Sequence, residues 1–340
     1  MTEVIFKRKI PCARKPVVDR LGFILPWGQG VVDQSKSLGL IKQRIQQAID
    51  AGLCKRAYPK GGRYRENFFI YLHGRDAFVQ IGALQPESQK GGIRVVLNPA
   101  LHEPDDIEKF HSIMEQIVGR DYQALLKTPL INQIDFAIDV VRADLSDLLV
   151  SYNHAQRHTI FGKRSGAGKN IESYYFGSVS SDYQTVAYAK DVQLKDTAIK
   201  RLISMRQQED SLKMNTIKQA KVEGPKIMRV EVRGKKMRGK KPWEIEAMPN
   251  RFSRFKFADL GGADSQLSTL LRTAFISMCR DRGVKAALES FKGSKSARKV
   301  RKFWKSRQAP WWKPALYWQQ AYEALKLTGV FPDEAFERDG

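Results

Sequence analysis

The chain has 340 residues, of which 42% are hydrophobic and 10% aromatic, and this composition excludes an intrinsically disordered protein. Its 59 Lys and Arg outnumber its 36 Asp and Glu, which gives a net charge of +23. A chain this basic usually meets a polyanion, because cationic side chains that neutralise phosphates release condensed counterions. Charge alone does not separate a nucleic-acid-binding protein from one with a generally cationic surface.

The cysteines and the apolar segments exclude several further classes. Cys12, Cys54 and Cys279 are odd in number, lie far apart and form no Cys-x-x-Cys pair, so we expect neither a disulfide scaffold nor a structural zinc site. The first residues lack the apolar region of a signal peptide, and no segment approaches the roughly 20 apolar residues that a membrane span needs. We therefore expect a cytoplasmic protein with no membrane partner.

The first part of the chain mixes helices and strands. Apolar residues at helical spacing predict helices around Leu40–Ala51 and over Asp105–Val118. Two apolar runs separated by a Gly-Arg-Asp turn predict a hairpin between Asn67 and Leu84. Ile93–Leu97 is expected to form a further strand, which Asn98-Pro99 ends.

The second part predicts mainly strands and ends in helices. Leu130–Val141 alternates apolar and polar residues and is the clearest strand of the chain. Asp144 is placed to cap a helix that begins at Leu145. The remaining expected elements are strands over Glu172–Gly177, Tyr183–Lys190 and Ile227–Arg233, a basic helix over about Leu194–Lys221, and a helix over Gln266–Arg280.

This order of elements predicts an α+β fold, in which helices flank a central antiparallel sheet. The tail after Phe291 is dense in Lys, Arg and Trp, which indicates a basic helical module at the C-terminal end. We place the boundary at residue 260, with a first domain over 1–260 and a DNA-binding or specificity module over 261–340.

Two aspartates of the clearest strand define the first candidate site. Asp135 and Asp139 are four residues apart, so both side chains point to one face of the strand with only Ala137 between them. Their like charges repel unless a cation or a hydrogen-bond network stabilises them. Glu231 on another strand offers a third carboxylate, and oxygen ligands of this kind suit Mg²⁺ or Mn²⁺. The spacing is equally compatible with carboxylates that pair with Arg229 and Arg233.

Tyr188 is the candidate nucleophile. It shares a strand face with Lys190 two residues further on. A tyrosine hydroxyl ionises near pH 10, so it becomes a useful nucleophile only beside a cation or a base, and Lys190 is placed to be that cation. By itself this pattern favours an ordinary strand tyrosine.

Several segments taken together resemble a known family. They are Ile134-Asp135-Phe136-Ala137-Ile138-Asp139, Tyr175-Phe176-Gly177-Ser178, Tyr188-x-Lys190 and Arg229-Val230-Glu231. Their order and spacing are similar to those of the Rep_trans, or replication initiation factor, family, over roughly residues 65 to 260. This family includes initiators of rolling-circle plasmids, relaxases of conjugative elements and replication proteins of filamentous phages.

The resemblance implies a nickase palm related to the RRM and ferredoxin-like folds, and it implies roles for five residues. Tyr188 would attack one DNA strand and form a 5′-phosphotyrosyl bond, with Lys190 assisting. Asp135, Asp139 and Glu231 would hold a divalent ion, Mg²⁺ or Mn²⁺. The expected partners are origin DNA, in the form of a hairpin that presents a single-stranded segment, a host helicase and a host polymerase. A homodimer stays open as the oligomeric state.

The chain also departs from the family pattern. Val186 and Gln133 stand where arginines are usual, and Gln193 and Val96 stand where glutamates occur. These departures bear on the finer phosphate contacts. They also leave open a non-catalytic DNA-binding repressor on this scaffold. A relaxase from the same family stays open for another reason, because its chemistry is the same as that of a rolling-circle initiator.

Two groups of basic residues are predicted to contact DNA. One lies on and just after the Arg229–Glu231 strand, and the other lies in the C-terminal module. Their side chains are expected to meet backbone phosphates, and they are Arg229, Arg233, Lys235, Lys236, Arg238, Lys299, Arg301 and Lys302. Phe303 and Trp304, inside the second group, are expected to pack in a core more than to stack on bases.

Overall fold

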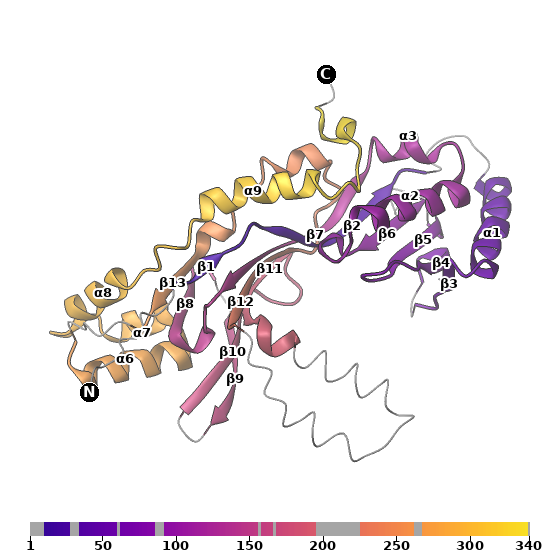
Figure 1. Cartoon of the computed structure of the whole chain (residues 1–340). Helices are drawn as coiled ribbons and strands as arrows, with labels where there is room; N and C mark the ends of the chain where they lie inside the picture. The colour runs from indigo at the N-terminus through magenta and orange to yellow at the C-terminus, as the bar shows by residue number, and fades with distance from the viewer. Residues whose placement is uncertain are drawn as a thin grey trace, which may run out of the picture.

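The computed structural model describes residues 10–27, 34–59, 62–85, 92–155, 158–165, 168–194, 225–261 and 267–338. These residues form an α+β fold in which helices are arranged along a long antiparallel sheet, as Figure 1 shows. The predicted fold class is therefore confirmed.

The main sheet has the strand order β3-β4-β5-β6-β2-β7-β12-β11-β10-β9, and β1 pairs with β7 outside this path. Every pair of neighbours is antiparallel. The strands are β1 (Cys12–Ala13), β2 (Val17–Leu25), β3 (Cys54–Arg56), β4 (Tyr64–Ile70), β5 (Ala77–Ala83), β6 (Ile93–Leu97), β7 (Leu130–Val141), β9 (His158–Ser165), β10 (Gly168–Phe176), β11 (Tyr183–Ala189) and β12 (Ile227–Gly234). A second sheet pairs β8 (Leu148–Tyr152) with β13 (Phe255–Asp259).

Most of the helices gather in two groups (Figure 1). One group, α1 (Gln34–Asp50), α2 (Pro104–Val118) and α3 (Tyr122–Leu126), lies at the end of the main sheet that holds β3 to β6. The other group, α6 (Thr269–Arg282), α7 (Val284–Ser290) and α8 (Ala297–Ser306), lies beside the second sheet of β8 and β13. The last long helix is α9 (Pro314–Lys326), and short 3-10 turns are η1 (Pro99–Leu101), η2 (Leu145–Asp147), η3 (Pro242–Ile245), η4 (Phe252–Arg254) and η5 (Asp333–Phe336). Among the described helices none is long and apolar enough to cross a membrane.

Strand β7 divides the fold into an apolar face and a polar face. Ile134, Phe136 and Ile138 are fully buried in the main core. The ring of Phe136 packs edge-on against Trp318 of α9, with 5.7 Å between the ring centres. Burial of one such aromatic side chain contributes about 1.5–3 kcal/mol, which fixes the other face of β7, with its aspartates, away from the core.

The C-terminal region is divided between two cores. Helices α6, α7 and α8 pack around Phe275, Phe303 and Trp304 in a cluster that also includes Leu149 of β8. Helix α9 and the residues after it return to the main core, where Phe331 packs on Phe23 with 4.9 Å between ring centres. Phe303 and Trp304 are thus core residues, as expected.

The helix predicted after Asp144 is wrong beyond its first turn. Asp144 does cap, because its Oδ1 accepts a 2.9 Å hydrogen bond from the Ser146 backbone N–H. Only the 3-10 turn η2 follows, and the chain then enters β8, whose Val150 pairs with Phe257 of β13. Pairing with a segment about a hundred residues away therefore outweighs the local capping signal.

Two other predicted elements differ from the structure or lie outside its described part. Strand β11 ends at Ala189, so Lys190 begins the next helical segment and does not continue the strand. The basic helix expected over Leu194–Lys221 falls almost entirely outside the described residues.

Candidate functional site

Three strands distant in sequence form the polar face behind the core. In the sheet β7 pairs with β12, and β12 pairs with β11. The register places Arg229 opposite both Asp139 and Tyr188, and it places Arg233 opposite Asp135. Because alternate residues of a strand share one face, these side chains and Glu231 all project from the same side of the sheet.

The hydroxyl of Tyr188 is bound to a carboxylate. Tyr188 Oη donates a hydrogen bond of 2.6 Å to Glu231 Oε1, and Arg233 Nε donates one of 2.7 Å to Glu231 Oε2. Glu231 is only 3% exposed. Burial, followed by the negative charge of Glu231 and this hydrogen bond, raises the pKa of Tyr188 above its usual range. Glu231 therefore holds the phenol in its protonated form and is the group placed to accept its proton.

Arg229 forms a second ion-pair network beside the tyrosine. Its Nε and Nη2 donate to the two carboxylate oxygens of Asp139 at 2.6 and 2.7 Å, and its Nη1 donates to Asp19 Oδ1 at 2.6 Å. Burial alone lowers the pKa of Arg229, but the hydrogen bonds and charge of Asp139 outweigh it and raise the pKa overall. This bidentate geometry is the strongest form of the guanidinium–carboxylate contact.

Asp19 is a member of this network that the sequence did not predict. Strand β2 pairs with β7, and an irregularity in register falls between Val18 and Arg20, exactly where Asp19 lies. A β-bulge of this kind redirects a side chain, which breaks the alternation that would reveal its face.

Asp135 differs from the other acidic residues of the face. It is 6% exposed, and its Oδ1 has no hydrogen-bond partner among the described residues. Burial raises the pKa of Asp135 to about 7, with the charge of Arg233 opposing and that of Glu231 adding to the shift. The protonated form of Asp135 is thus favoured over a wider pH range than that of an ordinary aspartate.

The three carboxylates expected to hold a metal are engaged differently. Asp139 is paired with Arg229, and Glu231 is bound by both Tyr188 and Arg233. In the part of the chain that the structure describes, no three His, Cys, Asp or Glu are grouped so that they could hold a metal ion. As arranged, the donors do not fit Mg²⁺ or Mn²⁺, because two guanidinium groups already neutralise them. A divalent ion would have to displace an arginine from its carboxylate.

Lys190 lies beside the ring of Tyr188. Its Nζ is 5.8 Å from the ring centre and donates a 2.9 Å hydrogen bond to Gln193 Oε1. Burial, and then the charge of Arg229, lowers the pKa of Lys190. The ammonium group thus lies over the phenol ring and adds positive charge to the site.

The residues predicted to contact DNA lie in three different settings. Arg229 and Arg233 are enclosed in the networks above. Lys235 and Lys236 secure the turn between β10 and β11, where they donate to Gln184 Oε1 at 2.8 Å and to the Ser180 carbonyl at 3.0 Å, and Arg238 donates to Asp182 at 3.2 Å.

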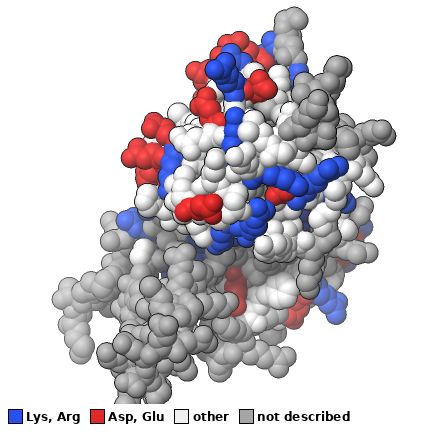
Figure 2. Space-filling view, turned by 90° about the vertical axis from the view of Figure 1, so that its right-hand side faces the viewer, with Lys and Arg blue, Asp and Glu red and all other residues white. Residues whose placement is uncertain are grey.

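Helix α8 is the third setting of the predicted DNA contacts. Lys299, Arg301 and Lys302 face solvent, while Val300 on the same helix is buried. By contrast, Figure 2 shows acidic and basic side chains interspersed on the end of the molecule that carries α1 and α2. The face of α8 is therefore a better candidate for a phosphate-binding surface than the opposite end.

Comparisons with known proteins add little to this geometry. No family model matches the chain, and no curated protein matches it. One solved structure, a rolling circle replication initiator protein from Geobacillus stearothermophilus, is 12% identical, with a TM-score of 0.35 over 79% of this chain and 98% of that chain. A likeness of this size carries no conclusion about function.

Proposed function

We propose that this protein nicks one strand of DNA and rejoins it through Tyr188. The observation that supports the proposal is the hydrogen bond between Tyr188 and the buried Glu231, with Arg229, Arg233 and Lys190 around it. A nucleophile beside a proton acceptor, with cations nearby, is the arrangement that attack on a phosphodiester needs.

In the proposed step, Tyr188 Oη attacks a backbone phosphorus while its proton passes to Glu231. The bond from phosphorus to the 3′ oxygen breaks, and that oxygen leaves as a 3′-hydroxyl after taking a proton from water. Because the pKa of Tyr188 is raised, loss of the proton must accompany attack and not precede it. Lys190 then stabilises the charge that develops on the phenol oxygen.

The phosphotyrosyl ester conserves the energy of the broken bond, so attack by a 3′-hydroxyl reverses the reaction without ATP. In a rolling-circle initiator the freed 3′-hydroxyl primes a host polymerase while a host helicase unwinds the duplex. We propose this role from the resemblance of the sequence, and a relaxase would use the same chemistry. The use of Mg²⁺ or Mn²⁺ stays a prediction of that resemblance.

A non-catalytic DNA-binding protein is the second candidate. Two features favour it, since the Tyr188 hydroxyl is already bound and Arg229 is fully occupied by Asp19 and Asp139. On this alternative the network is a structural element that fixes β7, β11 and β12 to one another. DNA would then bind through exposed basic side chains alone.

Covalent trapping separates the two candidates. The protein is incubated with supercoiled DNA of its own replicon, with Mg²⁺ or Mn²⁺, and protein joined to DNA is isolated under denaturing conditions. We expect an adduct from the wild type and none from Tyr188→Phe. Tyr175→Phe is the matched control, because Tyr175 on the neighbouring strand β10 pairs with Val186 and projects from the same sheet face as Tyr188. We expect this variant to form the adduct as the wild type does. Equal adducts from Tyr188→Phe and the wild type would overturn the assignment.

A further inference from the structure

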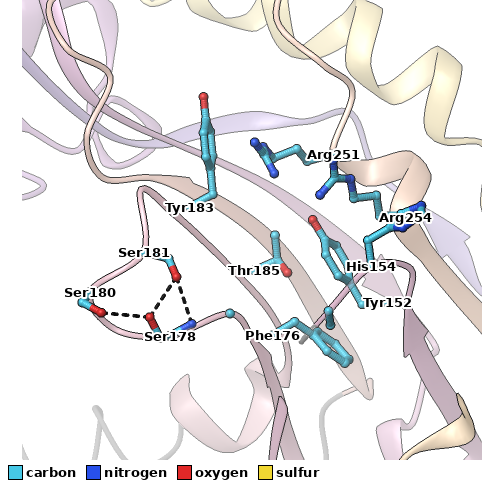
Figure 3. Close-up of a pocket in the computed structure, with 12 residues that line it drawn as sticks. Tyr152, His154, Phe176, Ser178, Ser180, Ser181, Tyr183, Thr185, Arg251 and Arg254 are labelled. Atoms are coloured by element: carbon cyan, nitrogen blue, oxygen red, sulfur yellow. Dashed lines mark hydrogen bonds between the residues drawn. The ribbon is translucent and has the colours of Figure 1, made fainter. Parts of the chain in front are cut away.

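A pocket of about 450 Å³ lies on the opposite face of β11 from Tyr188. Tyr183 and Thr185 line it, and they alternate with Tyr188 along the strand, so they point the other way. The turn after β10, the end of β8 and the segment around η4 complete its wall (Figure 3). Thr185, the nearer of the two, is three positions from Tyr188, or about 10 Å along the strand, and it points to the other face, so this pocket is distinct from the tyrosine site.

Two arginines supply positive charge to the pocket. Arg251 lies flat on the ring of Tyr183, with its guanidinium carbon 3.5 Å from the ring centre, and Arg254 lies beside it (Figure 3). Among the described residues neither arginine has an acidic partner. Arg251 Nε is shielded from solvent and has no hydrogen-bond partner there either. An enclosed guanidinium N–H without an acceptor indicates a ligand with negative oxygens.

Hydroxyl groups face the arginines across the pocket. Ser178, Ser180 and Ser181 of the β10–β11 turn cluster together, with 3.0 and 2.8 Å from Ser178 Oγ to the other two hydroxyls (Figure 3). Thr185 is 2% exposed, and its Oγ1 has no partner in the described part of the chain. Hydroxyls both donate and accept, so these groups suit the mixed edge of a base or a sugar.

Aromatic rings form the apolar part of the wall. Tyr152 stacks on Phe176, with 5.3 Å between ring centres and 20° between ring planes. Phe176 and Tyr152 both line the pocket, so this stacked pair borders the space beside the serine turn. Aromatic surface, cationic groups and small hydroxyls in one cavity are the combination that holds a nucleotide.

We propose that this pocket binds one nucleotide unit, with its phosphate at Arg251 and Arg254 and its sugar or base against the serine turn and Thr185. The volume falls in the usual range for small-molecule sites, about 300–1,000 Å³, and is too large for a lone phosphate. The ligand is either a free nucleotide or one nucleotide of a DNA strand, because the recognised chemistry is the same. The proposal does not depend on catalysis by Tyr188.

Calorimetric titration of the full chain tests whether the pocket binds a nucleotide. The ligands are the four deoxynucleoside 5′-monophosphates, inorganic phosphate and an oligonucleotide of about eight residues. The variants are Arg254→Gln, which removes one cation, and Thr185→Val, which removes the unpartnered hydroxyl while keeping its shape. Arg65→Gln is the control, because Arg65 is exposed on β4 at the far end of the sheet.

We expect Arg254→Gln to weaken nucleotide binding at least tenfold and Thr185→Val to weaken it severalfold, with no change in Arg65→Gln. Binding of monophosphates identifies a free nucleotide as the ligand, whereas binding of the oligonucleotide alone identifies a strand nucleotide. Tyr188→Phe should leave either affinity unchanged, which separates this pocket from the proposed nicking. Three results would overturn the proposal. The wild type would bind neither the monophosphates nor the oligonucleotide, Arg254→Gln would bind them as tightly as the wild type does, or inorganic phosphate would bind as tightly as a nucleotide.

Discussion

The hydroxyl of Tyr188 donates a 2.6 Å hydrogen bond to Glu231, whose second carboxylate oxygen accepts from Arg233. Tyrosine and glutamate come from neighbouring strands, β11 and β12, and Val186, not Tyr188, is the direct cross-strand partner of Glu231. The contact is therefore diagonal, and it depends on the register of the two strands as well as on their residues.

Glu231→Gln tests the electrostatic part of this contact. The neutral amide still accepts a hydrogen bond but no longer repels a phenolate, so we expect the pKa of Tyr188 to fall toward its ordinary value. The change is read from tyrosinate absorbance as the difference between each protein and its Tyr188→Phe derivative. Glu246→Gln, an exposed glutamate elsewhere, is the control. An unchanged Tyr188 titration would show that burial alone sets this pKa.

Asp135→Asn tests the buried carboxyl. The folded-state pKa of Asp135, about 7, lies above its unfolded value of about 4. The folded protein therefore binds the proton more tightly than the unfolded chain does, and its free energy of unfolding decreases as the pH rises between these two values. The loss extends from about pH 4 to about pH 7 and amounts to roughly 4 kcal/mol at most. We expect Asp135→Asn to remove that pH dependence in urea unfolding and to be the more stable protein at pH 8. Parallel stability profiles for the two proteins would contradict the raised pKa.

Arg229→Gln tests whether the guanidinium of Arg229 occupies the position between Asp19 and Asp139 that a divalent metal ion would otherwise take. Its removal leaves Asp19 and Asp139 without a partner, and loss of one member of a buried ion pair costs about 3–5 kcal/mol. The same change should increase affinity for Mn²⁺, because two carboxylates become free to bind it, and paramagnetic resonance of free Mn²⁺ measures this. Arg65→Gln should change stability by no more than about 0.5 kcal/mol. If Arg229→Gln bound Mn²⁺ more weakly than the wild type does, Arg229 and Mn²⁺ would not compete for Asp19 and Asp139.

The exposed face of α8 gives a prediction about salt. Each phosphate contact contributes about 0.9 to the log–log slope of duplex affinity against salt. Replacement of Lys299, Arg301 and Lys302 by Ala should thus reduce that slope by up to about 2.7 and weaken binding to all sequences. Cleavage of a short single-stranded substrate at saturation should survive. The control replaces Arg65 and Arg75, both exposed near β4 and β5, and an equal effect per charge removed would mean that α8 is not the binding face.

Much of the fold was predictable because its strongest elements are locally encoded. The alternation through Leu130–Val141 identified β7 and showed which aspartates share a face. The helix predicted after Asp144 failed because a capping aspartate begins a 3-10 turn as well as an α-helix. Burial of Val150 against Phe257, distant in sequence, decides which one forms.

The candidate site was predictable in its members but not in its pairing. Sequence spacing left two readings of Asp139, a metal ligand or a partner of arginine, and only the register that sets Arg229 opposite Asp139 separates them. The pocket beneath Tyr183 gave no sequence signal. Its arginines come from the segment around η4 and its serines from the β10–β11 turn, and the pairing of β13 with β8 brings the first of these segments beside the end of β8.

The most direct measurement is to locate the modified residue. The protein is allowed to react with a single-stranded oligonucleotide of its own replicon, the product is digested with protease and nuclease, and peptides that carry a nucleotide are sequenced by mass spectrometry. The account predicts one modified peptide, with the mass added on Tyr188. Modification at Tyr174, Tyr175 or Tyr183, or a protein that binds this oligonucleotide but never becomes joined to it, would contradict the proposed chemistry.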